Sequence, residues 1–155
     1  MRRWFPSTVR RRALGLIWLL LSAAAPPQSF PATATGTIEV AVAGVRSASG
    51  KVKVDVCTRA TFLKDCPWSG TARAHAGTVV VEVRGVPSGR YAIQAFHDAN
   101  DNGECDQGLF GIPREAVGFS NDAFTGLSRP KFDKAAFDFN GGRLRLLLKL
   151  RHVLG

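Results

Sequence analysis

Strict alternation of apolar and polar side chains constrains this chain more than any other feature of its sequence. Residues 37–45, 51–57, 78–84 and 143–152 each place Val, Ile or Leu at every second position, with charged or small residues between them. A period of two residues puts one face of a β-strand on a core and the other in water. No segment of the sequence carries the 3.6-residue period of an amphipathic helix. The pattern therefore predicts an all-β fold.

Turn-forming residues separate these runs and indicate the architecture. Ser-Gly at 49–50 and Pro-Ser-Gly at 87–89 break the alternation, and residues 90–97 and 136–139 add two less regular strands. Asn-Gly-Gly at 140–142 tolerates positive φ, which predicts a tight hairpin into the last strand. Short strands without crossover helices predict a single antiparallel β-sandwich of the immunoglobulin or prealbumin-like kind, not parallel βαβ units.

Residues 110–132 differ from these runs because they lack alternation and carry several Phe residues among Gly and Pro. A stretch of about twenty residues without regular structure is uncommon in a compact domain and is often functional. We expect one long irregular loop here. Its aromatic side chains either plug an open end of the sandwich or form an exposed surface for a polymer, peptide or partner protein.

The beginning of the chain has the composition of an export signal. Five Arg residues lie within residues 1–12, and an apolar run over 13–25 follows, shorter than the ~20 residues that a membrane span needs. Small residues then offer cleavage sites near positions 24 and 34. We predict a signal peptide over 1–34 and a β-sandwich domain over 35–155, periplasmic or secreted. An uncleaved membrane anchor and twin-arginine export are the alternatives.

The net charge of +9 does not indicate a nucleic-acid partner. The predicted signal peptide holds five of the 21 Lys and Arg residues, and the charge of the other 16 is largely balanced by the 12 Asp and Glu residues of the chain. Basic residues at alternate positions of 143–151 are expected to form a solvated face that also discourages edge pairing. The alternative is that this face binds anionic glycans. We expect no membrane span after signal cleavage, and an unknown ligand or envelope protein as the partner.

Three motifs between the predicted strands resemble a known bacterial family. Residues 97–106 read HDANDNGECD, residues 110–115 read FGIPRE and residues 118–121 read GFSN. In this order they resemble the family named domain of unknown function 2141. GVPSGRYAI at 85–93 also resembles a turn signature of prealbumin-like and collagen-adhesin-B-type sandwiches. The family resemblance covers nearly all of the predicted domain, and it implies an exported β-sandwich with no established activity.

Residues 98–106, which we call the acidic loop, are the best chemical candidate. Their oxygens follow the spacing of a calcium-binding loop, with Glu104 contributing its carbonyl: Asp98, Asn100, Asn102, Glu104 and Asp106. The bidentate Glu of such loops is missing at the twelfth position, and Glu115 is the candidate to replace it. The alternative is a metal-free turn in which Asp and Asn side chains cap nearby backbone N–H groups. The sequence leaves both interpretations open.

The chain has three cysteines, which suits export. Cys57 and Cys66 flank a short loop, and in an oxidising compartment such a pair is expected to form a disulfide. Cys105 then remains as a free thiol or as one end of an intermolecular bridge. A zinc site made from the three Cys residues and a His lacks the CxxC spacing that would support it.

Catalytic candidates are few. His97 precedes Asp98 at a strand end, so a hydrolase centred on this pair, with Glu115 and Ser120 in reach, is the alternative function. A His in such a place more often orders its own loop. The sequence has no nucleophile elbow, P-loop or dinucleotide-binding motif. We therefore predict an exported non-enzyme that binds a ligand or partner at the cell envelope, with calcium as the candidate cofactor.

Overall fold

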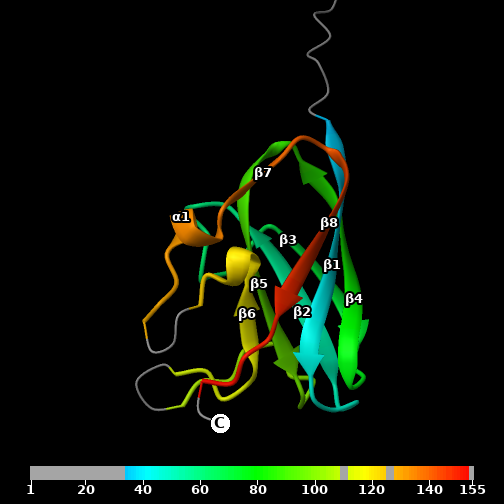
Figure 1. Ribbon diagram of the computed structural model, residues 1–155, viewed down its shortest axis with the longest axis vertical. Coiled ribbons are helices and arrows are strands. Elements are labelled where there is room, and N and C mark those ends of the chain that lie inside the picture. The colour runs from blue at the N-terminus through cyan, green and yellow to red at the C-terminus, as the bar shows by residue number, and fades with distance from the viewer. Residues whose placement is uncertain (1–33, 109–111, 125–127, 154–155) are drawn as a thin grey trace, which may run out of the picture. The chain divides into compact units, whose positions relative to one another are not determined.

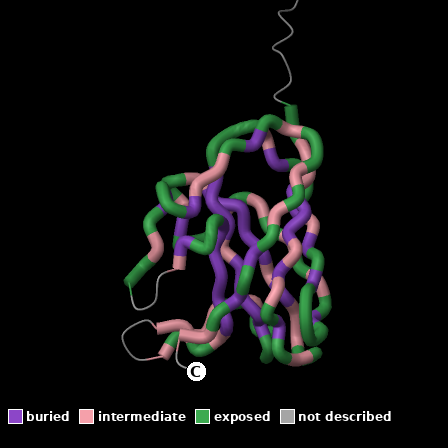
Figure 2. Tube along the Cα trace, in the orientation of Figure 1, coloured by how far each residue is buried: buried purple, intermediate pink, exposed green. Residues whose placement is uncertain are grey.

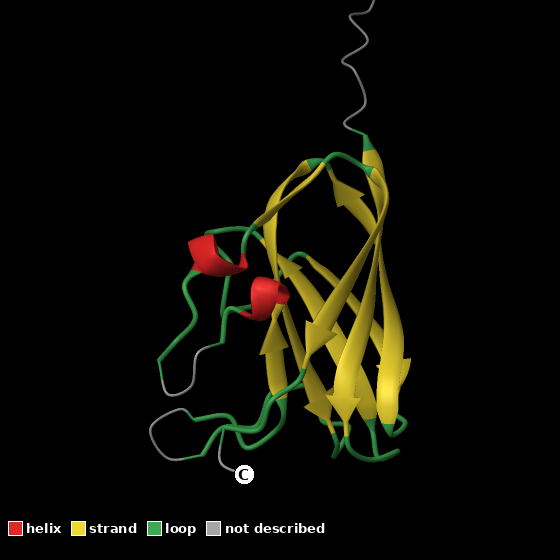
Figure 3. Ribbon diagram, in the orientation of Figure 1, coloured by secondary structure: helices red, strands yellow, loops and turns green. Residues whose placement is uncertain are grey.

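The computed structural model describes residues 34–108, 112–124 and 128–153. They form two β-sheets packed face to face, which confirms the all-β sandwich (Figure 1). The strands are β1 Thr35–Val45, β2 Lys51–Cys57, β3 Trp68–Arg73, β4 Gly77–Pro87, β5 Gly89–Asp98, β6 Val117–Phe119, β7 Phe137–Phe139 and β8 Gly142–Lys149. Two short helical turns, η2 at Ser120–Asp122 and α1 at Phe132–Ala135, follow β6 (Figure 3). The predicted signal peptide lies outside the described residues, apart from its last residue.

The two sheets have the strand orders β4-β1-β8 and β3-β2-β5-β6, and β7 pairs with β5. Every pair of strands is antiparallel except β1 and β8, which run parallel. This pair corrects the prediction of a wholly antiparallel sandwich. A parallel pair needs a long connection, and between the first and last strands the rest of the domain supplies it without a crossover helix.

The inward side chains of β1, β2 and β4 make the core between the sheets. They are Val or Ile at every second position, and none is more than 2% exposed: Ile38, Val40, Val42, Val52, Val54, Val56, Val79, Val81 and Val83. Figure 2 shows the buried residues gathered along the facing strands. Burying one such side chain contributes about 1.5–3 kcal/mol, and a slip of one residue would expose a whole set. The alternation therefore fixes the register of these strands.

Several elements were not expected from the sequence. In β3, Gly70 and Ala72 are among the partly buried residues, and such small side chains give almost no apolar period. A Cβ on Gly70 would lie 2.3 Å from the carbonyl oxygen of Glu82, so β3 approaches β4 too closely for a side chain there. The expected irregular loop over 110–132 contains β6 and η2. Elements of three residues are too short to show a period.

A second apolar cluster lies on the outer face of β2, β5 and β6. Its buried members are Cys57, Phe62, Ala92, Phe96, Val117, Phe119, Ala123, Phe132 and Ala135. The ring of Phe62 meets Phe119 and Phe132 edge to face, with centroids 5.9 and 5.8 Å apart. Phe119 and Phe132 therefore neither plug an end of the sandwich nor form an exposed surface, because they cover one face of a sheet. Phe110 lies outside the described residues.

The glycines at 141 and 142 turn the chain, but they do not make the predicted hairpin. Gly141 and Gly142 have φ values of 84° and 74°, as a turn of this kind requires. However, β7 pairs with β5, through Phe139 and Gly89, whereas β8 pairs with β1. The turn therefore carries the chain from one sheet to the other. Phe139 is 2% exposed, and its burial against the core holds β7 away from β8.

Ion pairs neutralise much of the basic face of β8. Arg143 contacts Glu39 and Glu82 at 3.1 and 3.2 Å, and Arg145 contacts Glu39 at 2.7 Å. Arg151, just after the strand, pairs with an acid of the η2 turn. These acids lie on neighbouring elements, so the face is less cationic than its sequence indicates.

Ser120 joins β5, η2 and α1. Its hydroxyl accepts a hydrogen bond from the Ile93 N–H at 2.9 Å and donates one to the Ala135 carbonyl at 2.6 Å. The side chain is buried at 5% exposure, so neither backbone group has water as a substitute. Ser120 therefore fixes the segment after β6 against the sheet.

Replacing Ser120 tests this role. Ser120→Ala should lower the free energy of unfolding by about 1–3 kcal/mol, because two buried backbone groups lose their partner. The matched control is Ser69→Ala on exposed β3, which should change stability by less than about 0.5 kcal/mol. Urea unfolding followed by tryptophan fluorescence measures both variants. Equal stability of Ser120→Ala and the wild type would contradict the role.

Candidate functional site

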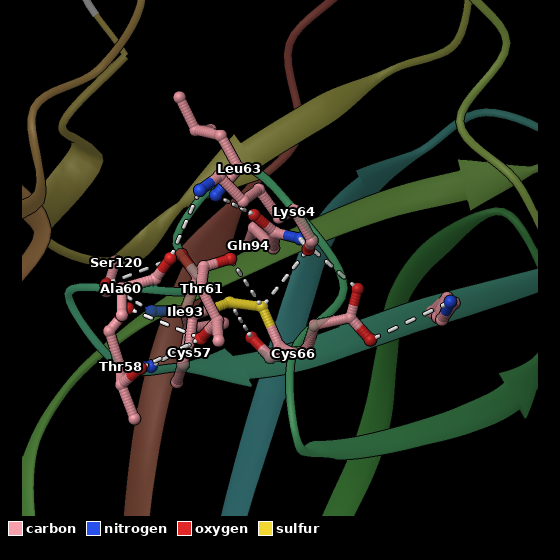
Figure 4. Close-up of a disulfide and its surroundings, with 12 residues drawn as sticks. Cys57, Thr58, Ala60, Thr61, Leu63, Lys64, Cys66, Ile93, Gln94 and Ser120 are labelled. Atoms are coloured by element: carbon pink, nitrogen blue, oxygen red, sulfur yellow. Dashed lines mark hydrogen bonds and ion pairs between the residues drawn. A yellow bond between two sulfur atoms is a disulfide. The ribbon is translucent and has the colours of Figure 1, made fainter.

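Cys57 and Cys66 form a disulfide with Cα atoms 4.9 Å apart, which confirms the predicted bridge (Figure 4). Cys57 points to the outer face of its sheet, yet it is fully buried. Residues 58–65, which we call the bridged loop, lie over this face, and the ring of Phe62 within the loop belongs to the same buried cluster as Cys57. A hydrogen bond of 3.0 Å from the Phe62 N–H to the Thr58 carbonyl turns the loop at its start. The bridge thus pins this loop to the sheet.

Gln94 of β5 ties the bridged loop down from the other end. Its side-chain oxygen accepts a hydrogen bond from the Leu63 N–H at 3.0 Å, and its amide nitrogen donates to the Lys64 carbonyl at 3.1 Å (Figure 4). The same nitrogen lies 3.4 Å from Oδ2 of Asp55, which is paired with Gln94 across β2 and β5. The bridged loop therefore forms a fixed wall beside the outer face.

A cavity of about 470 Å³, which we call the outer groove, lies over the outer face of β2, β5 and β6. The bridged loop, the acidic loop and residues 112–113, 124 and 128–130 surround it. Apolar side chains of the sheet reach it: Phe96, Val117 and Phe119. Charged side chains also line it: Lys53, Asp55, Lys64, Asp65, Glu104 and Arg129. A mixed lining of this kind suits a ligand that is part apolar and part polar.

The acidic loop binds its own backbone. Asp98 is fully buried, and its oxygens accept hydrogen bonds from the N–H groups of Asn102 and Gly103 at 3.0 and 2.8 Å. The two oxygens of Asp106 accept from the side-chain amides of Asn100 and Asn102 at 2.8 and 3.0 Å. These four predicted site residues therefore share one hydrogen-bond network, the arrangement expected of a self-capped turn.

Glu115 closes the acidic loop from just before β6. Its carboxylate accepts hydrogen bonds from the N–H groups of Ala99 and Asp106 at 3.1 and 3.3 Å. Burial raises the pKa of Glu115, with a smaller contribution from nearby acids, and the two N–H groups oppose this shift. Glu104 is exposed, and its N–H donates to the Asn102 side chain at 2.9 Å. Glu115 thus binds the backbone of the acidic loop, whereas Glu104 lies in the loop itself and lines the outer groove.

Calcium binding at the acidic loop stays a prediction. Within the described part of the chain, no group of three or more His, Cys, Asp or Glu side chains is placed to hold a metal ion. The Asp98 oxygens already accept two backbone hydrogen bonds, so an ion there would compete with the bonds that shape the loop.

One protein family matches the sequence. The family described as an uncharacterized protein conserved in bacteria (DUF2141) matches residues 40–146, which run from β1 into β8. The chain belongs to this family. No curated protein and no solved structure matches it. The acidic loop and the segment around Ser120 both lie inside the DUF2141 match.

The side chains predicted for the alternative hydrolase site make their hydrogen bonds to backbone groups of this DUF2141 protein and not to one another. The His97 ring donates from Nε2 to the Ser49 carbonyl at 2.8 Å, and its backbone N–H donates to the Ala116 carbonyl at 3.0 Å. The Ser120 hydroxyl is hydrogen-bonded to backbone groups of β5 and α1, and the Glu115 carboxylate accepts hydrogen bonds from backbone N–H groups of the acidic loop. Among the described residues, no hydrogen bond joins these three side chains. The structure therefore does not assemble them into one catalytic group.

Cys105 is a free thiol that lines the outer groove. Burial raises its pKa to about 11, and the nearby carboxylates of Glu115 and Asp106 contribute to this shift. At neutral pH the thiol is therefore protonated and a poor nucleophile. Its place in the groove wall makes it a packing residue.

Asp55 is the site residue that the sequence analysis missed. Its side chain is only 8% exposed, although it lies on the polar side of the alternation in β2. Its carboxylate accepts a hydrogen bond from the Gln94 amide at 3.4 Å and lies 3.9 Å from the Lys53 ammonium, and both distances exceed that of a good hydrogen bond. Burial raises its pKa, Lys53 and Gln94 lower it, and Asp65 raises it further. One feature of the sequence indicates that Asp55 is buried. Cys57 lies two residues later on the same face of β2, and its bridge to Cys66 brings a loop over that face.

Replacing Asp98 measures what holds the acidic loop. Asp98→Ala should lower the free energy of unfolding by about 1–3 kcal/mol, because the N–H groups of Asn102 and Gly103 lose a buried, charged acceptor. A calcium site with Kd near ~1 mM would add about 1.4 kcal/mol to the wild type at about 10 mM Ca²⁺, a melting shift of several degrees that Asp98→Ala would abolish. A self-capped loop gives the same loss in Ca²⁺ and in EDTA. Thermal melts in both buffers separate the two cases, with Asp138→Ala, at an exposed ion pair on β7, as a control outside the loop.

Asp55 should make stability depend on pH. Its folded-state pKa lies above the unfolded value, so the stability of the wild type falls as the pH rises across the interval between them. Asp55→Asn should therefore melt at a higher temperature than the wild type at about pH 7, and the gain should shrink toward about pH 4. Asp138→Asn, at an exposed ion pair on β7, should change the melting temperature little. A lower melting temperature for Asp55→Asn at neutral pH would contradict this.

Proposed function

We propose that this protein is an exported, non-enzymatic binding protein that holds a small amphipathic ligand in the outer groove. The observation that carries the proposal is the groove itself, a cavity of about 470 Å³ with apolar and charged side chains on its lining. Small-molecule sites commonly have about 300–1,000 Å³ and combine an apolar lining with a few polar groups.

Aromatic rings support an apolar portion of the ligand. Phe119 and Phe124 stack with their ring centroids 6.1 Å apart, and both line the outer groove. The ammonium of Lys53 lies 5.7 Å from the ring centroid of Phe96, where the sheet and the groove meet. Such rings offer large apolar contact area with little loss of side-chain freedom. The charged groups around them would hold the polar end.

The walls of the groove are held in place by the protein itself. The disulfide and Gln94 fix the bridged loop, while Asp98 and Glu115 fix the acidic loop. Lys53 also reaches across to the Gly103 carbonyl at 3.4 Å. Preformed walls reduce the ordering cost of binding. A calcium ion at the acidic loop, which the sequence predicts as one of two alternatives, would act on the same wall.

Two features support export. A disulfide in a small domain is typical of the periplasm or the extracellular space. The composition of residues 1–34 is that of a signal peptide. Over the ranges that the structure covers, no helix has the length and apolar character needed to cross a membrane.

A neutral fluorescent probe tests the binding function. N-phenyl-1-naphthylamine should bind the folded protein saturably and brighten, because its apolar rings enter the groove. Phe124→Ala should weaken binding by about 5–30-fold, the equivalent of about 1–2 kcal/mol of lost aromatic contact. The matched control is Leu147→Ala, a 74% exposed apolar residue on the other sheet, which should bind as the wild type does. Absence of saturable binding, or equal weakening by both variants, would overturn the proposal.

A further inference from the structure

Asp55 is a buried acid at the outer groove, and its polar contacts with the described residues are long. A carboxylate can accept about four hydrogen bonds. Here one oxygen has the Gln94 amide at 3.4 Å and the other has Lys53 at 3.9 Å. A buried charge is costly unless it is paired and hydrogen-bonded. Asp55 therefore has one long hydrogen bond and one long ion pair at its carboxylate, which leaves room for a further donor.

Lys53 does not fill this role because other groups compete for its ammonium. Nζ lies 3.4 Å from the Gly103 carbonyl and 5.7 Å from the centroid of the Phe96 ring. It is thus shared between the acidic loop, an aromatic ring and Asp55. Lys64 and Arg129 are the other bases in the groove lining, and Lys64 reaches back to the Ala60 carbonyl at 3.5 Å.

The neighbours of Asp55 also disfavour an anionic group beside it. Asp65 acts on Asp55 as a like charge, and Glu104 lines the groove on the side of the acidic loop. An anion next to these carboxylates would be repelled, whereas a cation would be attracted to all of them. Aromatic faces nearby add a favourable environment for a cation.

We propose that the ligand of the outer groove is an amphipathic amine, with its ammonium group bound at Asp55 and its apolar body on the rings of Phe96, Phe119 and Phe124. This inference rests on the proposed function, since it needs the groove to be a binding site. It adds the charge and the chemical class of the ligand.

Three dansyl probes with the same ring system and different tails test the charge of the ligand. Dansylcadaverine carries a primary ammonium, dansyl-butylamide is neutral, and dansyl-aminohexanoate is anionic. The wild type should bind the cation at least about tenfold more tightly than the anion, with the neutral probe between them. Fluorescence titrations at low salt, where ion pairs are least screened, measure all three affinities.

Asp55→Asn keeps the shape of the side chain and removes its charge. This variant should lose the preference for the cation, so that its affinities for the cationic and neutral probes differ by less than about twofold. Asp138→Asn, which removes an exposed acid far from the groove, should keep the preference. Because Asp55→Asn is expected to be the more stable protein, unfolding does not explain a loss of cation binding.

The outcomes separate the two proposals. Binding of the neutral probe with no preference for the cation, or a preference that survives Asp55→Asn, overturns the amine inference and leaves the groove as a binding site. Tighter binding of the anion also overturns it. If none of the probes binds, the proposed function fails and the amine inference fails with it.

Discussion

The register of β2 between β3 and β5 is the constraint on which the rest of the structure depends. It turns Val52, Val54 and Val56 into the core and leaves the alternate residues on the outer face. A slip of one residue would bury charges between the sheets and expose the valines. The same register that builds the sandwich therefore also places Asp55 and Cys57 at the outer groove. Fold and candidate site rest on one set of strand pairs, so neither can change without the other.

Two buried acids on this outer face show how structural and functional carboxylates differ. Asp98 receives two short backbone hydrogen bonds, and Lys51 lies 3.6 Å from it. Asp55 has only long contacts, although it is nearly as deeply buried. The first acid is satisfied by the loop that it organises, and its removal should damage that loop. The second has long contacts beside a groove, which is the observation from which we propose its role as a binding residue.

The sequence predicts those parts of this protein that local patterns encode. Alternation predicts β2 over its observed range, and the spacing of Cys57 and Cys66 predicts their bridge. It does not predict β3, whose small inward residues show no period, nor the parallel pairing of β1 with β8. The outer groove is equally hidden, because alternation reports which face meets the core and says nothing about what covers the other face. Contacts such as Gln94 with Leu63 join residues far apart in sequence and follow no local pattern.

The three motifs that carry the family resemblance all serve the frame of the same groove. The HDANDNGECD stretch forms the self-bonded acidic loop, the FGIPRE stretch supplies the Glu115 that closes it, and the GFSN stretch holds Phe119 over the sheet through Ser120. Asp55, Lys53 and the bridged loop lie outside these motifs, yet they contribute most of the charge around the groove. The motifs therefore build the frame of the groove, and the charges from which we propose the class of ligand lie mostly on strand and loop residues that no motif marks.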